Sequence, residues 1–408
     1  MRDFSQGTIT DCVVWAGPDV APVRCGAFAW EAGKITGMDL GEAATEAGGC
    51  RYGVIPGLVN AHTHVGDCFL PEVAVPLTLE EAFFRPHGYK YRALESISAA
   101  DHVRQMSGFL GEMAASGTVA HVDFREQGLE GARRLREASD LSGVRSVILG
   151  QLKVSPQSEA ELSDAERPLP AGAAEELKEM LSVADGFSES TMNDLTDAAW
   201  REVRSITRDL DRARAIHCLE NDGYRALSLS RTGKGDLERA LELLDPDLVV
   251  HLTVAMDAEI DLLAASGKTA VLNPRANAAL GLPLPPVAKL MKAGVNLLLG
   301  TDNGILNGPD LFRELDFTYR LARSQWGDGR HPLPGEILKM ATANFGRTRW
   351  GAEIPGTLSE GGPATFVVVD LTRPHFQNSR DLTGTLITRT APGDLLQTVF
   401  RGKTVYHA

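Results

Sequence analysis

The chain has 408 residues, a formal net charge of -13 and a sequence pI near 5.3. This acidity argues against nucleic acid as a partner, because phosphate binding requires a cationic face. Its five cysteines are scattered and make no disulfide framework, and no apolar run approaches the ~20 residues that span a bilayer. We therefore expect a cytoplasmic protein that acts on a small molecule, with no nucleic acid or membrane partner.

Two kinds of pattern divide the chain. Residues 1–55 and 351–408 contain short apolar runs broken by glycine and proline, which predicts a small β-sandwich-like unit built from both termini. Residues 56–350 alternate short apolar strands with amphipathic helical stretches, as parallel strands joined by crossover helices do. That length suits a TIM (β/α)8 barrel, so we predict an α/β fold with these two parts. A doubly wound sheet is the alternative, but its first strand would carry a glycine-rich fingerprint.

Eight strands are predicted within the barrel, and reactive side chains are expected at their carboxyl ends. The predicted strands are Val54–Ala61, Thr118–Phe124, Val144–Val154, Val183–Phe187, Ala213–His217, Leu248–His251, Ala270–Leu272 and Val295–Gly300. The first of them leads into the sequence Asn60-Ala61-His62-Thr63-His64. Because residues i and i+2 of a strand point to one side, both histidines aim into the barrel mouth, where they can share a divalent metal.

Three further strands end in residues that suit a metal site. The fifth ends in His217 with Glu220 in the following loop, the sixth ends in His251, and the eighth leads into Asp302. Each has an ordinary explanation by itself, such as a core histidine or an aspartate that caps a helix. Four separate strands that all end in metal-type residues favour a shared metal centre.

The chain resembles the amidohydrolase superfamily, and within it the single-metal branch that contains cytosine deaminase, guanine deaminase and the atrazine chlorohydrolase-like enzymes. The motif residues that carry this resemblance are His62, His64, His217, Glu220, His251 and Asp302. Supporting segments are PGLVNAHTH (56–64), NPRANAALGLPLPPVAKLMKAGVNLLLGTDN (273–303) and ATANFGR (341–347). The resemblance covers essentially the whole chain, and it implies a homo-oligomer.

The same resemblance implies one divalent metal ion per chain, with zinc first and iron or manganese as alternatives. Its ligands would be His62, His64, His217 and Asp302. The two-metal branch carries a bridging lysine on its fourth strand, whereas Lys153 lies at the end of the predicted third strand. This difference favours one ion over two.

The implied chemistry is hydrolysis through a metal-bound hydroxide. Glu220 would act as the proton shuttle, because attack on a ring carbon that bears an amino group requires protonation of the adjacent ring nitrogen. His251 would hold or polarise the attacking water, and Asp302 would accept a proton from it.

Basic residues around the predicted mouth suggest that the substrate carries an anionic group. Alternation in the second strand sends Arg125 into the mouth, and the third strand adds Lys153. Arg85 and His87 lie in the long loop after the first strand. Asn277 is a further expected substrate contact, although relatives often read Cys-Pro-x-Ser-Asn where this chain has Asn-Pro-Arg-Ala-Asn.

Three functions remain open from the sequence. The leading one is an aminohydrolase (deaminase) that acts on an N-heterocyclic substrate with an anionic group. The second is a hydrolase of a cyclic amide, or of another carbon–nitrogen or carbon–halogen bond, with the same metal. The third is a non-catalytic scaffold of the same fold, against which the complete ligand set and Glu220 argue. Release of ammonia would separate the first from the second.

Overall fold

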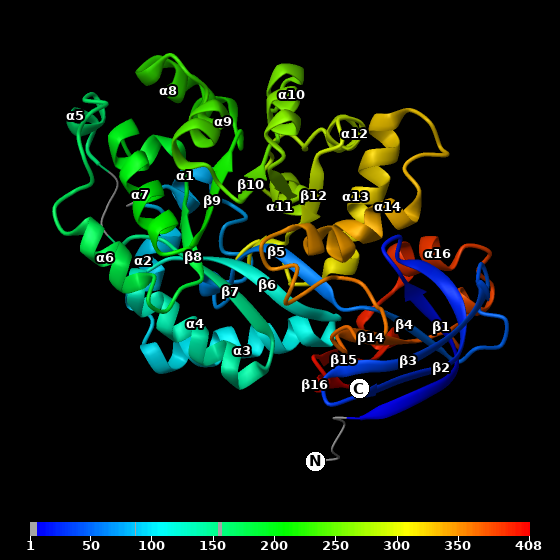
Figure 1. Cartoon of the computed structure of the whole chain (residues 1–408). Coiled ribbons are helices and arrows are strands. Elements are labelled where there is room, and N and C mark those ends of the chain that lie inside the picture. Colours follow the sequence, from blue (N-terminus) through cyan, green and yellow to red (C-terminus); the bar gives the residue numbers. More distant parts are fainter. Residues whose placement is uncertain (1–5, 86, 154–156) are drawn as a thin grey trace.

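Two β-sheets organise the computed structural model, which describes residues 6–85, 87–153 and 157–408 (Figure 1). The larger sheet runs β12-β11-β10-β9-β8-β7-β6-β5-β13. Its pairs are parallel, and only Gly300 and Thr301 separate β12 (Asn296–Leu299) from β13 (Asp302–Asn303), which pairs with β5 (Leu58–His64). The last strand thus returns to the first, and the sheet curls into the predicted α/β barrel.

The other barrel strands lie close to their predicted positions. They are β6 (Thr118–Arg125), β7 (Arg145–Gly150), β8 (Gly186–Glu189), β9 (Ala213–Cys218), β10 (Leu248–His251) and β11 (Thr269–Leu272). The third strand ends at Gly150, and its predicted end at Val154 lies outside the described residues. Branched aliphatic side chains such as Val122, Val250 and Leu298 form the inner core of the barrel.

The first predicted strand, Val54–Ala61, is in fact two strands in different sheets. β4 (Tyr52–Pro56) belongs to the smaller sheet, and β5 begins the barrel. The chain changes sheets at Gly57, where a Cβ atom would lie 2.5 Å from Cγ1 of Val119. The continuous apolar run hid this boundary, because both strands are buried.

Helices cover the outside of the barrel with their apolar faces. Those of ten residues or more are α3 (Ala99–Ala115), α4 (Gly128–Ser142), α7 (Asp197–Asp209), α8 (Asp222–Thr232), α10 (Asp257–Ser266) and α13 (Leu311–Trp326). Shorter ones are α1 (Leu79–Phe83), α2 (Tyr89–Ser96), α5 (Glu159–Leu162), α6 (Ala173–Met180), α9 (Asp236–Arg239), α11 (Pro274–Ala279), α12 (Val287–Lys292), α14 (Pro334–Leu338), α15 (Pro374–Gln377) and α16 (Leu382–Arg389). In the described part of the chain no helix has the length and apolar character to cross a membrane.

The smaller sheet joins strands from the two ends of the chain (Figure 1). Its order is β16-β15-β14-β4-β1-β2-β3, with β1 (Gly7–Ala16), β2 (Ala21–Glu31), β3 (Lys34–Ala43), β14 (Phe366–Asp370), β15 (Leu395–Phe400) and β16 (Lys403–His407). β14 pairs with β4, and Phe366 packs edge-on against Phe28 and Trp30, with ring centroids 5.1 and 4.9 Å away. The sandwich-like form expected for this part stays a prediction.

Candidate metal centre and reaction cavity

Four buried side chains converge at the carboxyl ends of three barrel strands. His62 and His64 lie at the end of β5, His217 lies in β9, and Asp302 begins β13. Nε2 of His62 is 3.3 Å from Nε2 of His217 and 3.2 Å from Oδ1 of Asp302. Nε2 of His64 is 3.7 Å from the same Asp302 oxygen. The structure thus brings together all four residues that the sequence predicts as metal ligands.

The geometry and the donor chemistry fit one divalent ion. Two nitrogens that each lie about 2.0–2.1 Å from one zinc ion at a tetrahedral angle are roughly 3.3–3.4 Å apart. The His62 and His217 nitrogens are 3.3 Å apart. Burial lowers the pKa of His62 to about 4 and lowers that of His217 well below its ordinary value. Both imidazoles are therefore neutral at pH 7, as metal ligation requires.

Unusual backbone geometry marks the points where β9, β10 and β12 end. Leu219, His251 and Asp302 have φ angles of 54°, 81° and 66°, in the left-handed region that non-glycine residues rarely adopt. Two hydrogen bonds hold the segment before Asp302 against β5: the Asn60 amide donates to Thr301 Oγ1 at 2.7 Å and accepts from Thr301 N at 3.0 Å. Strained backbone of this kind persists at functional sites, where the surrounding structure enforces it.

A narrow cavity of about 40 Å³ opens beside the ligands. Leu79 and Phe83 of α1 and Tyr91 of α2 form part of its wall, and Tyr224 of α8 forms another part. Phe84 stacks on the Tyr224 ring, with centroids 5.2 Å apart and an angle of 19° between the planes. The cavity thus combines an aromatic and aliphatic wall with the polar side chains around the candidate metal centre.

Glu220 and His251 face this cavity. Burial, followed by the negative charge of Asp302, raises the pKa of Glu220 to about 8, so this carboxyl holds a proton at pH 7. Its Oε1 lies 3.7 Å from Nε2 of His251. Burial lowers the pKa of His251 to about 3, and its Nδ1 lies 3.1 Å from Nδ2 of Asn277. Asn277, expected to contact the substrate, is thus buried against His251 and is not among the residues that line the cavity.

Arg125 lies on the outer side of the barrel wall, which corrects the predicted orientation of β6. The ring of Phe124 lies 4.4 Å from that of His62, so Phe124 faces inward and Arg125 faces outward. Arg125 is fully buried, with Nη1 3.4 Å from Glu126 Oε2 and Nη2 donating to Gln127 Oε1 at 3.0 Å. The prediction was wrong because both faces of a barrel strand are buried, so hydrophobicity does not distinguish them.

The other basic residues expected to grip the substrate also lie away from this cavity. Arg85 pairs with Glu189, with Nη1 2.8 Å from Oε1. Arg85 and Lys153 line a separate cavity of about 350 Å³, and His87 is exposed. Among the described residues that line the reaction cavity, Lys90 is the single lysine or arginine.

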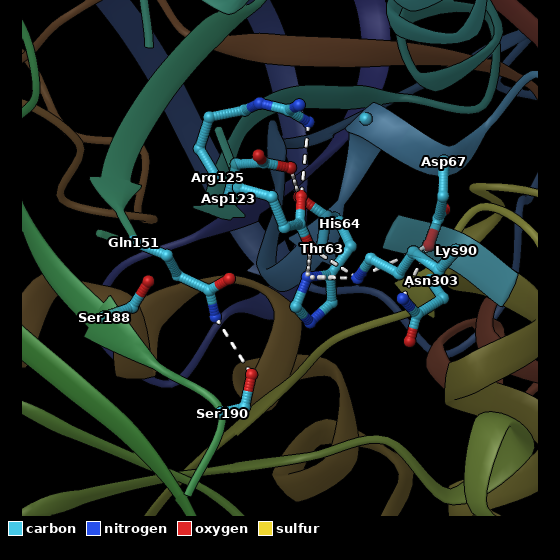
Figure 2. A network of polar contacts seen from close by, with 12 residues as sticks. Thr63, His64, Asp67, Lys90, Asp123, Arg125, Gln151, Ser188, Ser190 and Asn303 are labelled. Atoms are coloured by element: carbon cyan, nitrogen blue, oxygen red, sulfur yellow. Dashed lines mark hydrogen bonds and ion pairs between the residues drawn. The ribbon is translucent and has the colours of Figure 1, made fainter. Parts of the chain in front are cut away.

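The sequence did not reveal the polar groups behind His64 (Figure 2). The His64 Nδ1 nitrogen lies 2.7 Å from Glu126 Oε1, and Lys90 pairs with the same carboxylate. Lys90 also lies 3.6 Å from Oδ2 of Asp67, which accepts a hydrogen bond from Asn303. Glu126 is a charged residue directly after a strand whose residues are all buried, and this position is a partial sign of its role.

Known proteins resemble this chain along nearly its full length. The family described as "Amidohydrolase family" matches residues 54–405. A protein of Methanothermobacter thermautotrophicus is 33% identical over 353 residues, which are 86% of each chain. The 5'-deoxyadenosine deaminase of Methanosarcina mazei is 29% identical over 401 residues, 96% of this chain and 90% of that relative. An adenosine deaminase from Xanthomonas campestris, solved with bound zinc, shares the fold with a TM-score of 0.81 at 22% identity, over 96% of this chain and 92% of that one.

Proposed function

Because the chain belongs to the amidohydrolase family, we propose that this metal-dependent hydrolase is an aminohydrolase that removes an amino group from a purine-type ring. The observation that carries the proposal is the position of Glu220, a buried carboxyl that lines the cavity beside the candidate metal centre, with Oε1 3.7 Å from Nε2 of His251. Deamination requires such a proton donor at the ring nitrogen next to the attacked carbon. The similarity to a 5'-deoxyadenosine deaminase supports a purine nucleoside as the substrate class.

We assign one divalent ion per chain, with zinc first, to His62, His64, His217 and Asp302. The ion would supply Lewis-acid chemistry, since a divalent metal lowers the pKa of a water that it binds from 15.7 to about 7. Oδ1 of Asp302 lies 3.2 Å from Nε2 of His62 and 3.7 Å from Nε2 of His64, so this carboxylate oxygen faces the position that the ion would occupy. As a carboxylate, Asp302 would help to hold the ion and would accept a proton from the attacking water.

Glu220 and His251 have complementary roles in this proposal. Glu220 would donate its proton to the ring nitrogen, while Asp302 accepts one proton of the attacking water. Glu220 would then take up the remaining proton of the new hydroxyl group and deliver it to the amino group that leaves as ammonia. The proton on Asp302 would return to Glu220 through solvent. The Asn277 amide donates toward Nδ1 of His251, which leaves the ring proton on Nε2, the nitrogen nearest Glu220. His251 can then donate a hydrogen bond to the attacking water and hold it in place.

The substrate ring would lie between Leu79 and Phe83 on one side and Tyr224 on the other. The anionic group expected from the sequence is not retained. Of the described residues lining this cavity, the one cation, Lys90, already pairs with the buried carboxylate of Glu126. The predicted contacts of Arg125, Arg85 and Lys153 with a substrate have no support from the positions of these side chains.

The test is ammonia release by full-length protein loaded with one equivalent of zinc. Adenosine, 5'-deoxyadenosine, guanine, cytosine, a cyclic amide and a chlorotriazine are supplied separately, and ammonia, ring opening and chloride are measured. We expect ammonia from a purine nucleoside and none from the protein stripped of metal. Ring opening or chloride without ammonia would favour the second function, and no turnover with any compound would favour the scaffold.

We also propose the division of the chain and its assembly. Residues 1–55 and 351–408 would form one small β unit of sandwich-like form, and residues 56–350 would form the barrel. The pairing of β14 with β4 supports the first part, because these strands come from opposite ends of the chain. The five free cysteines support a reducing compartment such as the cytoplasm. A homo-oligomer is proposed as well, and sedimentation velocity measures it directly.

A further inference from the structure

We propose that Glu126 and Lys90 are positioning residues of the metal centre: Glu126 orients the His64 imidazole toward the ion, and Lys90 ties this carboxylate to the strand that carries Asp302. The inference rests on the proposed function, because it takes His64 and Asp302 as metal ligands. It concerns how tightly the chain holds the ion, so it can be measured without a substrate.

The first step is the protonation of the His64 ring. Its Nδ1 is 2.7 Å from Glu126 Oε1, and both side chains are buried, with exposed fractions of 6% and 2%. Lys90 Nζ contacts the same oxygen and lies 3.1 Å from Nδ1. A carboxylate oxygen is only an acceptor, so its contact of 2.7 Å with Nδ1 requires the ring proton on Nδ1, and the Lys90 ammonium then donates to the same carboxylate oxygen. The lone pair of Nε2 is then free, 3.7 Å from Oδ1 of Asp302, where a metal ligand needs it.

The second step is the balance of charge around Glu126. Its carboxylate is 2% exposed, and a buried charge without a partner is costly. Two cations from different elements face it: Lys90 of α2, which contacts Oε1, and Arg125 of β6, whose Nη1 lies 3.4 Å from Oε2. The sequence suggested Arg125 as a substrate contact. The structure instead places its positive charge beside Glu126, where it helps to keep this carboxyl ionised. An ionised Glu126 is a stronger acceptor for the His64 N–H than a neutral one.

The third step connects this pair to the strand of Asp302. Lys90 Nζ lies 3.6 Å from Oδ2 of Asp67, a fully buried carboxylate. Asp67 accepts a hydrogen bond from Asn303 Nδ2 at 2.6 Å, and Asn303 directly follows Asp302. Asn303 is also the register partner of His64 in the parallel pairing of β13 with β5. Figure 2 shows Lys90 between His64 on one side and Asp67 with Asn303 on the other.

Lys90 also lines the reaction cavity, so a direct contact with substrate is the competing role. Its surroundings favour positioning, because the ammonium already faces the carboxylates of Glu126 and Asp67. The two roles predict different results. A positioning residue changes metal affinity in the absence of substrate, whereas a substrate contact changes KM and leaves metal affinity unaltered.

The experiment measures the zinc dissociation constant of full-length, metal-free protein by competition with a chromogenic chelator. Glu126→Gln should weaken zinc binding by ~10–100-fold, the usual effect of losing the partner that orients a ligand. Glu130→Gln is the matched control, because Glu130 is an exposed glutamate that pairs only at the surface with Arg134, at 3.1 Å. The control should bind zinc as the wild type does.

Glu126→Gln removes a negative charge that faces two buried cations, so we expect this variant to be less stable than the wild type. Lys90→Met combined with Glu126→Gln removes one charge of each sign and should fold, with a loss of zinc affinity similar to that of Glu126→Gln alone. Lys90→Met by itself should also weaken zinc binding. The unfolding temperature of each metal-free variant is recorded to separate affinity from stability.

Wild-type affinity in Glu126→Gln or in the double variant, even with a lower unfolding temperature, would show a purely structural role and overturn the proposal. Unchanged affinity with a raised KM in Lys90→Met would make Lys90 a substrate contact and overturn its assigned role. Failure of the wild type to bind zinc would instead contradict the proposed function, so the two failures are distinguishable.

Discussion

Glu220 shows at the scale of one residue how the fold supplies chemistry. The carboxyl lies in a buried cavity beside Asp302, and burial together with that negative charge raises its pKa to about 8. An exposed glutamate would have lost its proton well below pH 7. The same environment that makes Glu220 a proton donor must therefore destabilise the metal-free protein when the carboxyl ionises.

This cost gives a prediction for Glu220→Gln in the metal-free protein. The pKa of Glu220 is higher in the folded protein than in the unfolded chain. Its ionisation therefore lowers the free energy of unfolding as the pH rises above the unfolded pKa of about 4.5, and this loss reaches its full size above pH 8 or so, the folded pKa being about 8. Glutamine does not ionise, so Glu220→Gln does not lose stability in this way. The unfolding temperatures of variant and wild type should match near pH 4, and the variant should gain an advantage that grows up to pH 8. Thermal unfolding over this pH range measures it, and a difference independent of pH would refute the assigned environment.

Single residues could be predicted from sequence only where the signal was local. His62 and His64 follow an apolar strand at a spacing of two, so the period of a strand placed both on one side. The contact of Glu126 and Lys90 with His64 could not be predicted, because it depends on α2 returning over the end of β5. Nothing in the spacing between positions 90 and 126 encodes that contact.

At the scale of the elements, hydrogen bonds between strands position the candidate metal ligands. β13 follows β12 after a two-residue break and pairs with β5, so the ligands His64 and Asp302 come from neighbouring strand ends. The reciprocal hydrogen bonds of Asn60 with Thr301 hold this junction. Buried polar groups that lose such partners cost about 1–3 kcal/mol.

Asn60→Ala should therefore destabilise the protein by about 1–3 kcal/mol, because it leaves the Thr301 N–H without its partner. It should also weaken zinc binding, since Asp302 directly follows Thr301. Urea unfolding and chelator competition measure the two effects. Asn378→Ala is the control, because Asn378 is exposed and donates only to Pro374 O. If Asn60→Ala is as stable as the control, the junction does not depend on this side chain.

Barrel strands were predictable as elements because a buried parallel strand reads as a short apolar run. The same burial hides which side of a strand faces the barrel axis. β6 has buried residues on both sides, and the orientation of Phe124 and Arg125 was predicted in reverse. The run from Val54 onward likewise concealed the change of sheet at Gly57. Hydrophobicity locates such strands, and only packing tells which side faces the axis.

On the scale of the whole molecule, the two ends of the chain meet in one sheet beside the barrel. The strand patterning at each end was visible in the sequence, and the structure pairs β14 with β4. Which strand neighbours which was not predictable, because pairing between distant segments leaves no local trace. Phe366, Phe28 and Trp30 form an aromatic contact across this junction.

Phe366→Ala should lower the free energy of unfolding by about 3–5 kcal/mol, because it leaves a cavity in this fully buried contact. Zinc affinity should stay near the wild-type value, since Phe366 lies in the smaller sheet and the ligands lie in the barrel. Leu333→Ala, at a side chain that is 56% exposed, is the control and should change stability little. A Phe366→Ala protein that keeps full stability would disprove that this contact holds the two ends together.

The central claim is that Glu220 moves protons beside a metal that it does not bind. The most direct measurement is the turnover and metal content of Glu220→Gln on a substrate that releases ammonia, with His217→Ala alongside. Glu220→Gln should keep its zinc and fold but lose ~10²–10⁴-fold in kcat, the usual worth of a positioned acid–base group. His217→Ala should lose metal and activity together, because its Nε2 faces the metal position. Near-normal turnover in zinc-loaded Glu220→Gln would contradict the account.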